Sequence, residues 1–135
     1  MSLDFAGFPR CVADCGRLLL AHEATTGYKV LQLCVGTSLS RCYGPDGGYV
    51  VKEKDRPIVA FLGDGRIRIS TNGLHYLGLT ARINACLPPG YEMRRARGRH
   101  PIGFELRRGK QVIAQFATST VFTPEAAEPA LEKCA

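Results

Sequence analysis

The chain contains no tryptophan, and its aromatic side chains are limited to five tyrosines and six phenylalanines. Aliphatic side chains therefore have to supply most of the surface that folding buries. The longest early apolar run, residues 18–21, is far too short to cross a bilayer. The N-terminus lacks the basic start and sustained apolar segment of a secretory signal peptide. These absences predict a protein without a membrane segment that stays in the cytoplasm of the host cell.

Recognisable catalytic motifs are also lacking. His22-Glu23 is followed by Ala-Thr-Thr, so the second histidine of a helical H-E-x-x-H zinc motif is missing. Cys15 and His22 can share a helix face, but no third group is identifiable that would orient them for nucleophilic catalysis. Gly63-Asp64-Gly65 is typical of a hairpin turn rather than a phosphate cradle, because no helix begins directly after it. We therefore expect a non-enzymatic protein that needs no cofactor.

Cysteine is plentiful for a cytoplasmic chain, with six residues at positions 11, 15, 34, 42, 86 and 134. Only Cys11 and Cys15 have a spacing short enough for a zinc site, and no histidine lies near Cys34 and Cys42. A disulfide framework would require an oxidising compartment. We favour thiols that are mostly buried in the core over a structural zinc site.

The composition is that of a chain that folds around a single core. Hydrophobic residues make up 45% and charged residues 22% of its 135 positions, which is typical of a globular domain. Residues 1–123 are expected to form one domain. Residues 124–135, rich in alanine and glutamate with an internal proline, are expected to form a tail.

Hydrophobic periodicity predicts two helices and a series of strands. Alternating or continuous apolar runs predict strands at residues 28–35, 49–53, 57–62, 66–70, 91–96, 102–107 and 111–117. A helix is predicted at about 10–24, with Gly27 as its stop, and a shorter one at 79–87, ended by Pro88-Pro89-Gly90. Residues 37–48 are expected to be turn-rich, and the charged residues 52–56 are expected to form a solvated turn.

The central part of the chain carries the sharpest local signals. Asp64-Gly65 favours a type I′ hairpin turn, after which Ile67 and Ile69 should face the core while Arg66 and Arg68 face away. In the short helix, Arg82 and Asn84 fall outside the apolar stripe, which is formed by Leu79, Ile83, Cys86 and Leu87. A helix followed by strands, with another helix inserted among them, predicts an α+β fold with a mainly antiparallel sheet.

Residues 63–91, about a quarter of the chain, resemble a small uncharacterised protein type encoded by bacteriophages and prophages. The matching residues are Asp64, Gly65, Asn72, Gly73, Thr80, Arg82, Ile83, Asn84, Leu87, Pro88, Gly90 and Tyr91. The chain departs from that pattern after Tyr91, where a basic hairpin replaces the usual aromatic strand. The resemblance implies a phage origin and no mechanism.

Positive charge is concentrated in one stretch, residues 92–110. Seven basic side chains there face only Glu92 and Glu105, so this stretch carries +5 of the chain's net +6. We expect the charges to converge on one end of the sheet, with Arg95 and Arg97 on one strand face and Arg94 on the other. The candidate binding residues are Arg94, Arg95, Arg97, Arg99, Arg107, Arg108 and Lys110.

A hairpin this basic suits contact with a phosphate backbone, so we favour a phage accessory protein that binds nucleic acid or a nucleoprotein. The alternative is an anti-defence inhibitor, similar in action to an anti-CRISPR protein, that covers an acidic surface of a host protein. A third interpretation is that the arginines only keep the strands solvated. Tyr91 and Phe104 flank the basic stretch and are expected to belong to the core rather than to stack on bases.

Overall fold

The computed structural model describes residues 7–42, 47–71, 77–96 and 103–124. The predicted turn at 71–73, the tip of the basic hairpin with Arg97 and Arg99, and the predicted tail lie wholly or largely outside the described residues, as does His75. Two helices and nine strands follow one another in the described residues. They are α1 (Val12–Thr26), β1 (Leu31–Cys34), β2 (Thr37–Arg41), β3 (Tyr49–Glu53), β4 (Arg56–Phe61), β5 (Ile67–Ser70), α2 (Leu77–Ala85), β6 (Tyr91–Arg95), β7 (Phe104–Arg108), β8 (Gln111–Phe116) and β9 (Ser119–Phe122).

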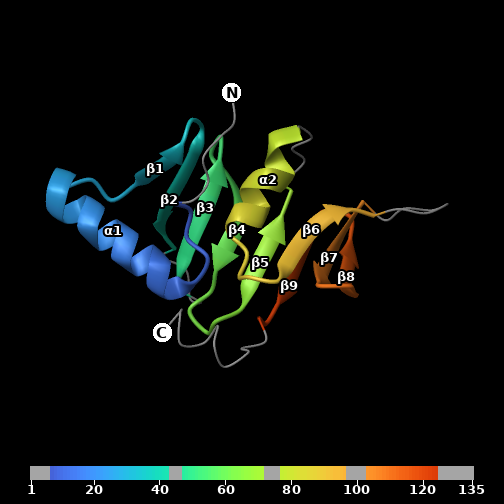
Figure 1. The fold of residues 1–135 in the computed structure, drawn as a ribbon. Coiled ribbons are helices and arrows are strands. Elements are labelled where there is room, and N and C mark those ends of the chain that lie inside the picture. Colours follow the sequence, from blue (N-terminus) through green and yellow to red (C-terminus); the bar gives the residue numbers. More distant parts are fainter. Residues whose placement is uncertain (1–6, 43–46, 72–76, 97–102, 125–135) are drawn as a thin grey trace.

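These strands form two antiparallel sheets, one of six strands in the order β1-β2-β3-β4-β5-β9 and one of three in the order β6-β7-β8. Both helices lie over the same face of the six-stranded sheet, and the smaller sheet stands beside β9 and α2 (Figure 1). The predicted α+β fold, with an N-terminal helix and a short helix between strands, is confirmed. Among the described residues, no helix combines the length and hydrophobicity that crossing a membrane requires.

The helix α1 forms where the periodicity predicted it, shifted by about one turn's fraction toward the C-terminus. Cys15 and Leu19 are its buried residues. Gly27 ends the helix in the left-handed conformation, and its amide donates to the Glu23 carbonyl, which is the usual role of a glycine that follows a helix.

Residues 37–41 are a strand, so the expectation of turns throughout 37–48 is wrong. Thr37 and Leu39 are buried on the helix-covered face, while Ser38 and Ser40 alternate with them on the other. The short polar serines concealed a period of two that only the pairing with β3 makes plain. Residues 43–46 lie outside the described part of the chain.

The hairpin between β4 and β5 is confirmed, although its turn differs from the predicted one. The Gly65 amide donates to the Leu62 carbonyl, and the Leu62 amide donates to the Arg66 carbonyl. Gly65 has a φ of 97°, whereas Asp64 is not among the residues with positive φ. This is a three-residue loop with glycine in the left-handed position rather than a type I′ turn. Ile67 and Ile69 are buried and Arg68 is exposed, as predicted.

Positive φ at both central residues, the requirement of a type I′ turn, occurs instead at Lys54 and Asp55 between β3 and β4. The expected solvated turn at 52–56 is therefore confined to two residues. Glu53 is buried at the end of β3, because its carboxylate has partners in the core.

Those partners are Thr37 and Arg82. The Thr37 hydroxyl donates to Glu53 Oε2, and Arg82 Nε lies 3.4 Å from the same oxygen and donates to Thr37 Oγ1 at 3.1 Å. Arg82 also donates from Nη1 to the Gly78 carbonyl. Although Arg82 lies outside the apolar stripe of α2, it is buried. The three side chains join β2, β3 and α2 through one polar cluster.

Two further contacts hold α2 and β6 in place. Arg10 Nη1 donates to the carbonyls of Asn84 and Leu87 at the C-terminal end of α2, where a cation also complements the helix dipole. The Asn84 amide donates to the Met93 carbonyl at 2.9 Å and accepts from the Met93 amide at 2.6 Å. Asn84 thereby covers the outer edge of β6 as a neighbouring strand would.

The strand β9 was not predicted. It pairs with β5 from Ile67↔Phe122 to Ser70↔Ser119 and so completes the six-stranded sheet. Its Phe122 is buried with its ring centroid 5.2 Å from that of Tyr91, which ties the six-stranded sheet to β6. The four residues Ser-Thr-Val-Phe are too short to show a period by themselves.

The Glu53–Arg82 pair gives a test of what holds α2 on the sheet. Replacing Arg82 with methionine leaves the Glu53 carboxylate buried without its cation, so we expect the free energy of unfolding to fall by about 3–5 kcal/mol. Urea denaturation measures the loss. Arg68→Met, which removes an exposed arginine from β5, should change the stability by no more than about 0.5 kcal/mol.

The double variant Glu53→Gln/Arg82→Met removes both charges and should recover part of the loss. Equal losses in Arg82→Met and Arg68→Met would show that the buried pair does not hold the helix.

Candidate nucleic-acid interface

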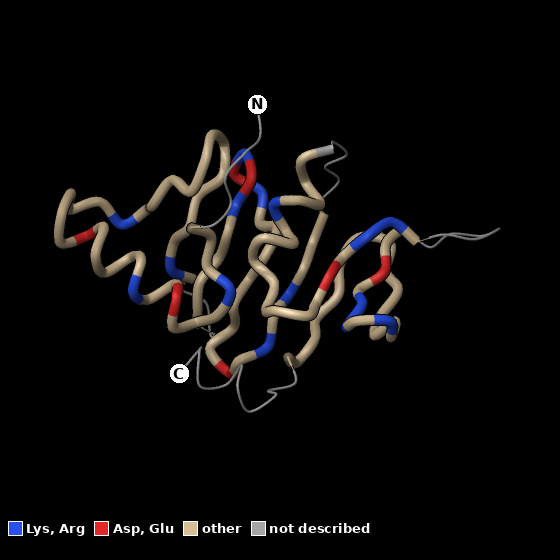
Figure 2. Tube along the Cα trace, in the orientation of Figure 1, with Lys and Arg blue, Asp and Glu red and all other residues tan. Residues whose placement is uncertain are grey.

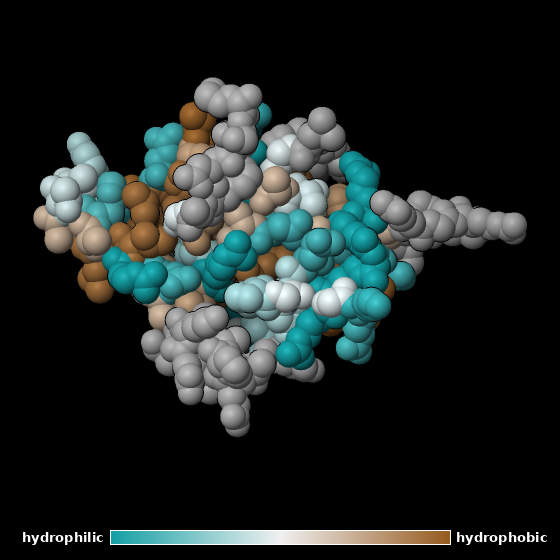
Figure 3. Space-filling model, in the orientation of Figure 1, coloured by the Kyte–Doolittle hydropathy of each residue, from teal (hydrophilic) through white to brown (hydrophobic). Residues whose placement is uncertain are grey.

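The three-stranded sheet β6–β7–β8 carries five of the seven predicted binding residues, namely Arg94, Arg95, Arg107, Arg108 and Lys110. Arg97 and Arg99 lie outside the described residues. Figure 2 shows basic residues gathered on this sheet, interrupted by two acidic ones, and Figure 3 shows the same region as largely hydrophilic.

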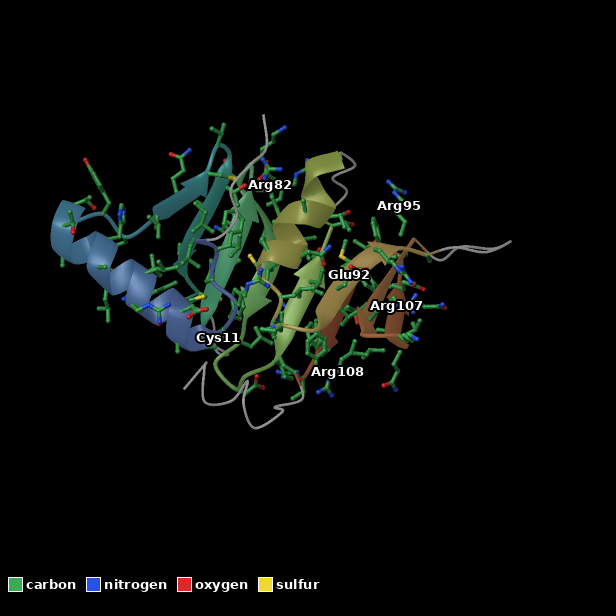
Figure 4. All side chains as sticks on the ribbon, viewed as in Figure 1. Cys11, Arg82, Glu92, Arg95, Arg107 and Arg108 are labelled. Carbon is green, nitrogen blue, oxygen red and sulfur yellow. The ribbon has the colours of Figure 1, made fainter. Side chains whose placement is uncertain are left out.

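The strand register separates the charges rather than bringing them together. Tyr91 pairs with Arg108 and Arg95 pairs with Phe104. Arg94 and Arg95 therefore lie at one end of the β6–β7 ladder, and Arg107 and Arg108 at the other, about 13 Å away for four residues of strand. The expectation that the charges converge on one end of the sheet is wrong, and Figure 4 shows Arg95 and Arg108 at opposite ends.

One face of this ladder, which we call the charged face, carries Glu92, Arg94, Glu105 and Arg107 in alternation. Glu105 is at its centre and accepts from Arg94 Nε at 3.1 Å and from Arg107 Nη1 at 3.2 Å. The Glu105 side chain is only 11% exposed, against 39% for Arg94 and 21% for Arg107. Two cations and two carboxylates balance on this face.

Arg107 is fixed at a second point as well. Its Nη2 donates to the Lys110 carbonyl at 2.9 Å, which closes the β7–β8 turn. Its Nε is buried and has no hydrogen-bond partner within the described part of the chain. This arginine is held by the fold more firmly than a solvated surface side chain.

The opposite face of the ladder is apolar with a cation at each end. Arg95 lies over the Phe104 ring at 5.6 Å and Arg108 lies over the Tyr91 ring at 5.8 Å, both within the range of cation–π attraction. Both rings are buried, so the prediction that they belong to the core is confirmed. Their second role, as platforms for the arginines, depends on cross-strand pairing that the sequence alone does not reveal.

The net charge of the described part of the sheet is therefore distributed unevenly. Five cations and two carboxylates leave a net +3. Since the charged face is balanced, the excess belongs to Arg95, Arg108 and Lys110, which lie off that face. The six-stranded sheet also has basic residues on the face away from the helices, where Lys52 and Arg68 are half-buried and exposed, respectively. Two cations on six strands are a sparser arrangement than this.

No group of three or more potential metal ligands occurs within the described ranges. The five described cysteines carry thiols rather than disulfides, with Cys15 and Cys86 buried and the other three half-buried. Cys134 lies outside the described residues. Cys11 sits at the N-cap of α1 in an extended conformation, so it does not share a helix face with Cys15 as the zinc alternative required.

The two buried thiols are poorly suited to react. Burial raises the pKa of Cys86 to about 12, an effect that the nearby Arg10 opposes. Burial also raises the pKa of Cys15, and the neighbouring thiols of Cys86 and Cys11 raise it further. Thiolate is the nucleophile and the metal ligand, so neither residue supplies either chemistry at neutral pH.

Comparison of the chain with protein-family models, with curated protein sequences and with solved structures found no match in any of the three.

The raised thiol pKa values predict how stability depends on pH. An unfolded chain releases these protons near the ordinary pKa of 9.0, whereas the folded chain retains them to higher pH. The unfolded state therefore binds fewer protons above pH 9, and the free energy of unfolding should fall by up to about 1.4 kcal/mol per pH unit for each thiol. Urea denaturation between about pH 8 and pH 10 measures this slope.

The variant Cys15→Ala/Cys86→Ala is the matched comparison. It should be less stable at pH 8, because it leaves space in the core, but it should lose the part of the slope that the thiols cause. An identical slope in parent and variant would contradict the assignment.

Proposed function

We propose that this protein is a non-enzymatic bacteriophage or prophage accessory protein that binds nucleic acid, or a nucleoprotein, through the three-stranded sheet β6–β8. The observation that carries the proposal is the placement of Arg95 and Arg108 on aromatic rings at the two ends of one strand pair. The resemblance of residues 63–91 to phage-encoded proteins supports the origin.

The spacing of these two arginines suits a duplex. Their positions are about 13 Å apart along the ladder, close to the width of about 12 Å of the DNA major groove. Guanidinium groups at this distance are able to contact phosphates on both sides of one groove. Such contacts position a protein on nucleic acid without reading its sequence, in keeping with an interface formed by arginine and lysine.

The arginines are also held in place before binding. Glu105 fixes Arg94 and Arg107, and the rings of Phe104 and Tyr91 orient Arg95 and Arg108. A side chain that is already ordered loses less conformational entropy when it binds a phosphate. Arginine is well suited to this contact, because its planar guanidinium donates two parallel hydrogen bonds to phosphate oxygens.

Salt dependence is the direct test. Binding of fluorescein-labelled duplex DNA, single-stranded DNA and RNA, followed by fluorescence anisotropy, should weaken as the salt concentration rises. For duplex DNA, each phosphate contact contributes about −0.9 to the slope of log K against log salt concentration. Arg95→Gln/Arg108→Gln should therefore flatten that slope by about 2 and weaken binding to all sequences alike.

The matched control is Lys52→Gln/Arg68→Gln, which removes the same amount of charge from the six-stranded sheet. It should keep the parent's slope. If both double variants bind alike, net charge rather than the three-stranded sheet governs binding, and the proposed interface is wrong.

A second candidate function is inhibition of a host protein by covering its surface. The observation that favours it is the charged face, where exposed Glu92 lies opposite Arg107 and Glu105 lies between two arginines. Carboxylates repel a phosphate backbone, but an alternation of charges complements a protein surface of mixed charge.

Nuclease treatment separates the two functions. The tagged protein is incubated with bacterial lysate, with and without nuclease, and retained proteins are identified by mass spectrometry. A nucleic-acid binder should lose its co-purifying proteins after nuclease treatment, because nucleic acid bridges them. A host protein that is retained after nuclease, and is lost when Glu92 and Glu105 are changed to glutamine, would favour the inhibitor.

A further inference from the structure

The large apolar side chains that are most exposed lie together at the end of the molecule away from the three-stranded sheet. Leu20 of α1 is 62% exposed, and Tyr28, Val30 and Val35, which flank β1, are 71%, 53% and 84% exposed. Figure 3 shows them as a hydrophobic area over α1 and β1. An apolar surface of this kind marks an interaction site more often than plain solvent exposure.

The second half of α1 lacks support from its own chain. Cys15 and Leu19 are the only residues of the helix that are buried, and none of residues 20–26 is. Figure 1 shows this half projecting past β1. A helix of 15 residues is marginal by itself and normally depends on packing of an apolar face, so its exposed Leu20 needs a partner.

The strand β1 is an edge strand that the fold leaves open. Its pairing partner in the described structure is β2 alone, and no charged residue occurs from position 30 to position 40. Natural edge strands are usually protected by charges, prolines or a covering segment. The contrast with β6 is direct, because Asn84 covers the edge of that strand.

We propose that a second copy of this chain covers the α1–β1 surface, with β1 of the two copies pairing antiparallel across a two-fold axis. The surface offers no unmatched charge for a charged partner to recognise, because Glu23 and Arg41, the nearest ion pair, bind each other. An uncharged edge strand is complementary to itself, and a two-fold axis uses the same residues on both sides.

The dimensions suit such a dimer. Residues 28–35 extend over about 26 Å as a strand, and one helix on one sheet is about 20 Å deep. The product, on the order of 500 Å² of flat area, is comparable with the roughly 800 Å² of accessible surface that each partner buries in a standard interface. Antiparallel pairing also brings Leu20 of each α1 toward the other helix. Both three-stranded sheets remain uncovered, so the dimer does not depend on the proposed function.

Analytical ultracentrifugation of the full chain at about 1–100 µM, which spans moderate dissociation constants, tests the proposal. We expect a species of twice the 14.7 kDa chain mass. Leu20→Lys/Val30→Lys should convert it to the monomer with an unchanged circular dichroism spectrum, because both side chains are exposed. Val112→Lys, at a 42% exposed position on the other open edge strand, β8, should remain a dimer.

Hydrogen exchange on the unmodified chain gives an answer that requires no variant. Amides of residues 31–34 should exchange more slowly at high than at low protein concentration, while amides of β8 should not change. A parent chain that is monomeric throughout this range, a dimer that survives Leu20→Lys/Val30→Lys, or one that Val112→Lys dissociates would each overturn the proposal.

Discussion

The ion pair between Glu53 and Arg82 is the contact on which the arrangement of the layers depends. It lies where β2, β3 and α2 meet, and Thr37 completes it with hydroxyl contacts to both partners. Buried charges tolerate little displacement, because each loses most of its hydration. With α2 held in this way, Asn84 positions β6 through the Met93 backbone. The placement of the three-stranded sheet, and of its arginines, follows from that chain of contacts.

Within the three-stranded sheet, structural and binding demands fall on opposite faces of β6 and β7. The charged face satisfies its own cations through Glu105, as a stable sheet requires. The apolar face packs into the core with Met93 and Leu106, and it carries Arg95 and Arg108 at its two limits, where core meets solvent. The sheet therefore adds positive charge at its ends without placing unpaired cations in its middle, where like charges on neighbouring strands would repel one another.

The parts of the fold that were predictable from the sequence are those specified by neighbours along the chain. The helix stop at Gly27 and the alternation of Ile67 and Ile69 required only local patterns. The strand β9 was missed because its partner Ser70 is remote from Ser119 in sequence, and Glu53 was read as solvated because its cation belongs to a later helix. For the candidate site, the sequence identified the basic strands. Which cations face carboxylates and which lie on rings depends on the register of β6 against β7, a long-range property.

The strand order has a consequence for the way the protein is made. Strands β1 to β5 are neighbours in the sheet in the same order as in the chain, so each pairs with the strand synthesised just before it. The partner of β5 on its other side is β9, which leaves the ribosome only after α2 and all of β6–β8. Closing so long a loop is slow compared with forming a hairpin. During that interval the edge of β5, with Ile67 and Ile69, stays open to other chains, so the rate at which β9 arrives sets the period of greatest risk of aggregation.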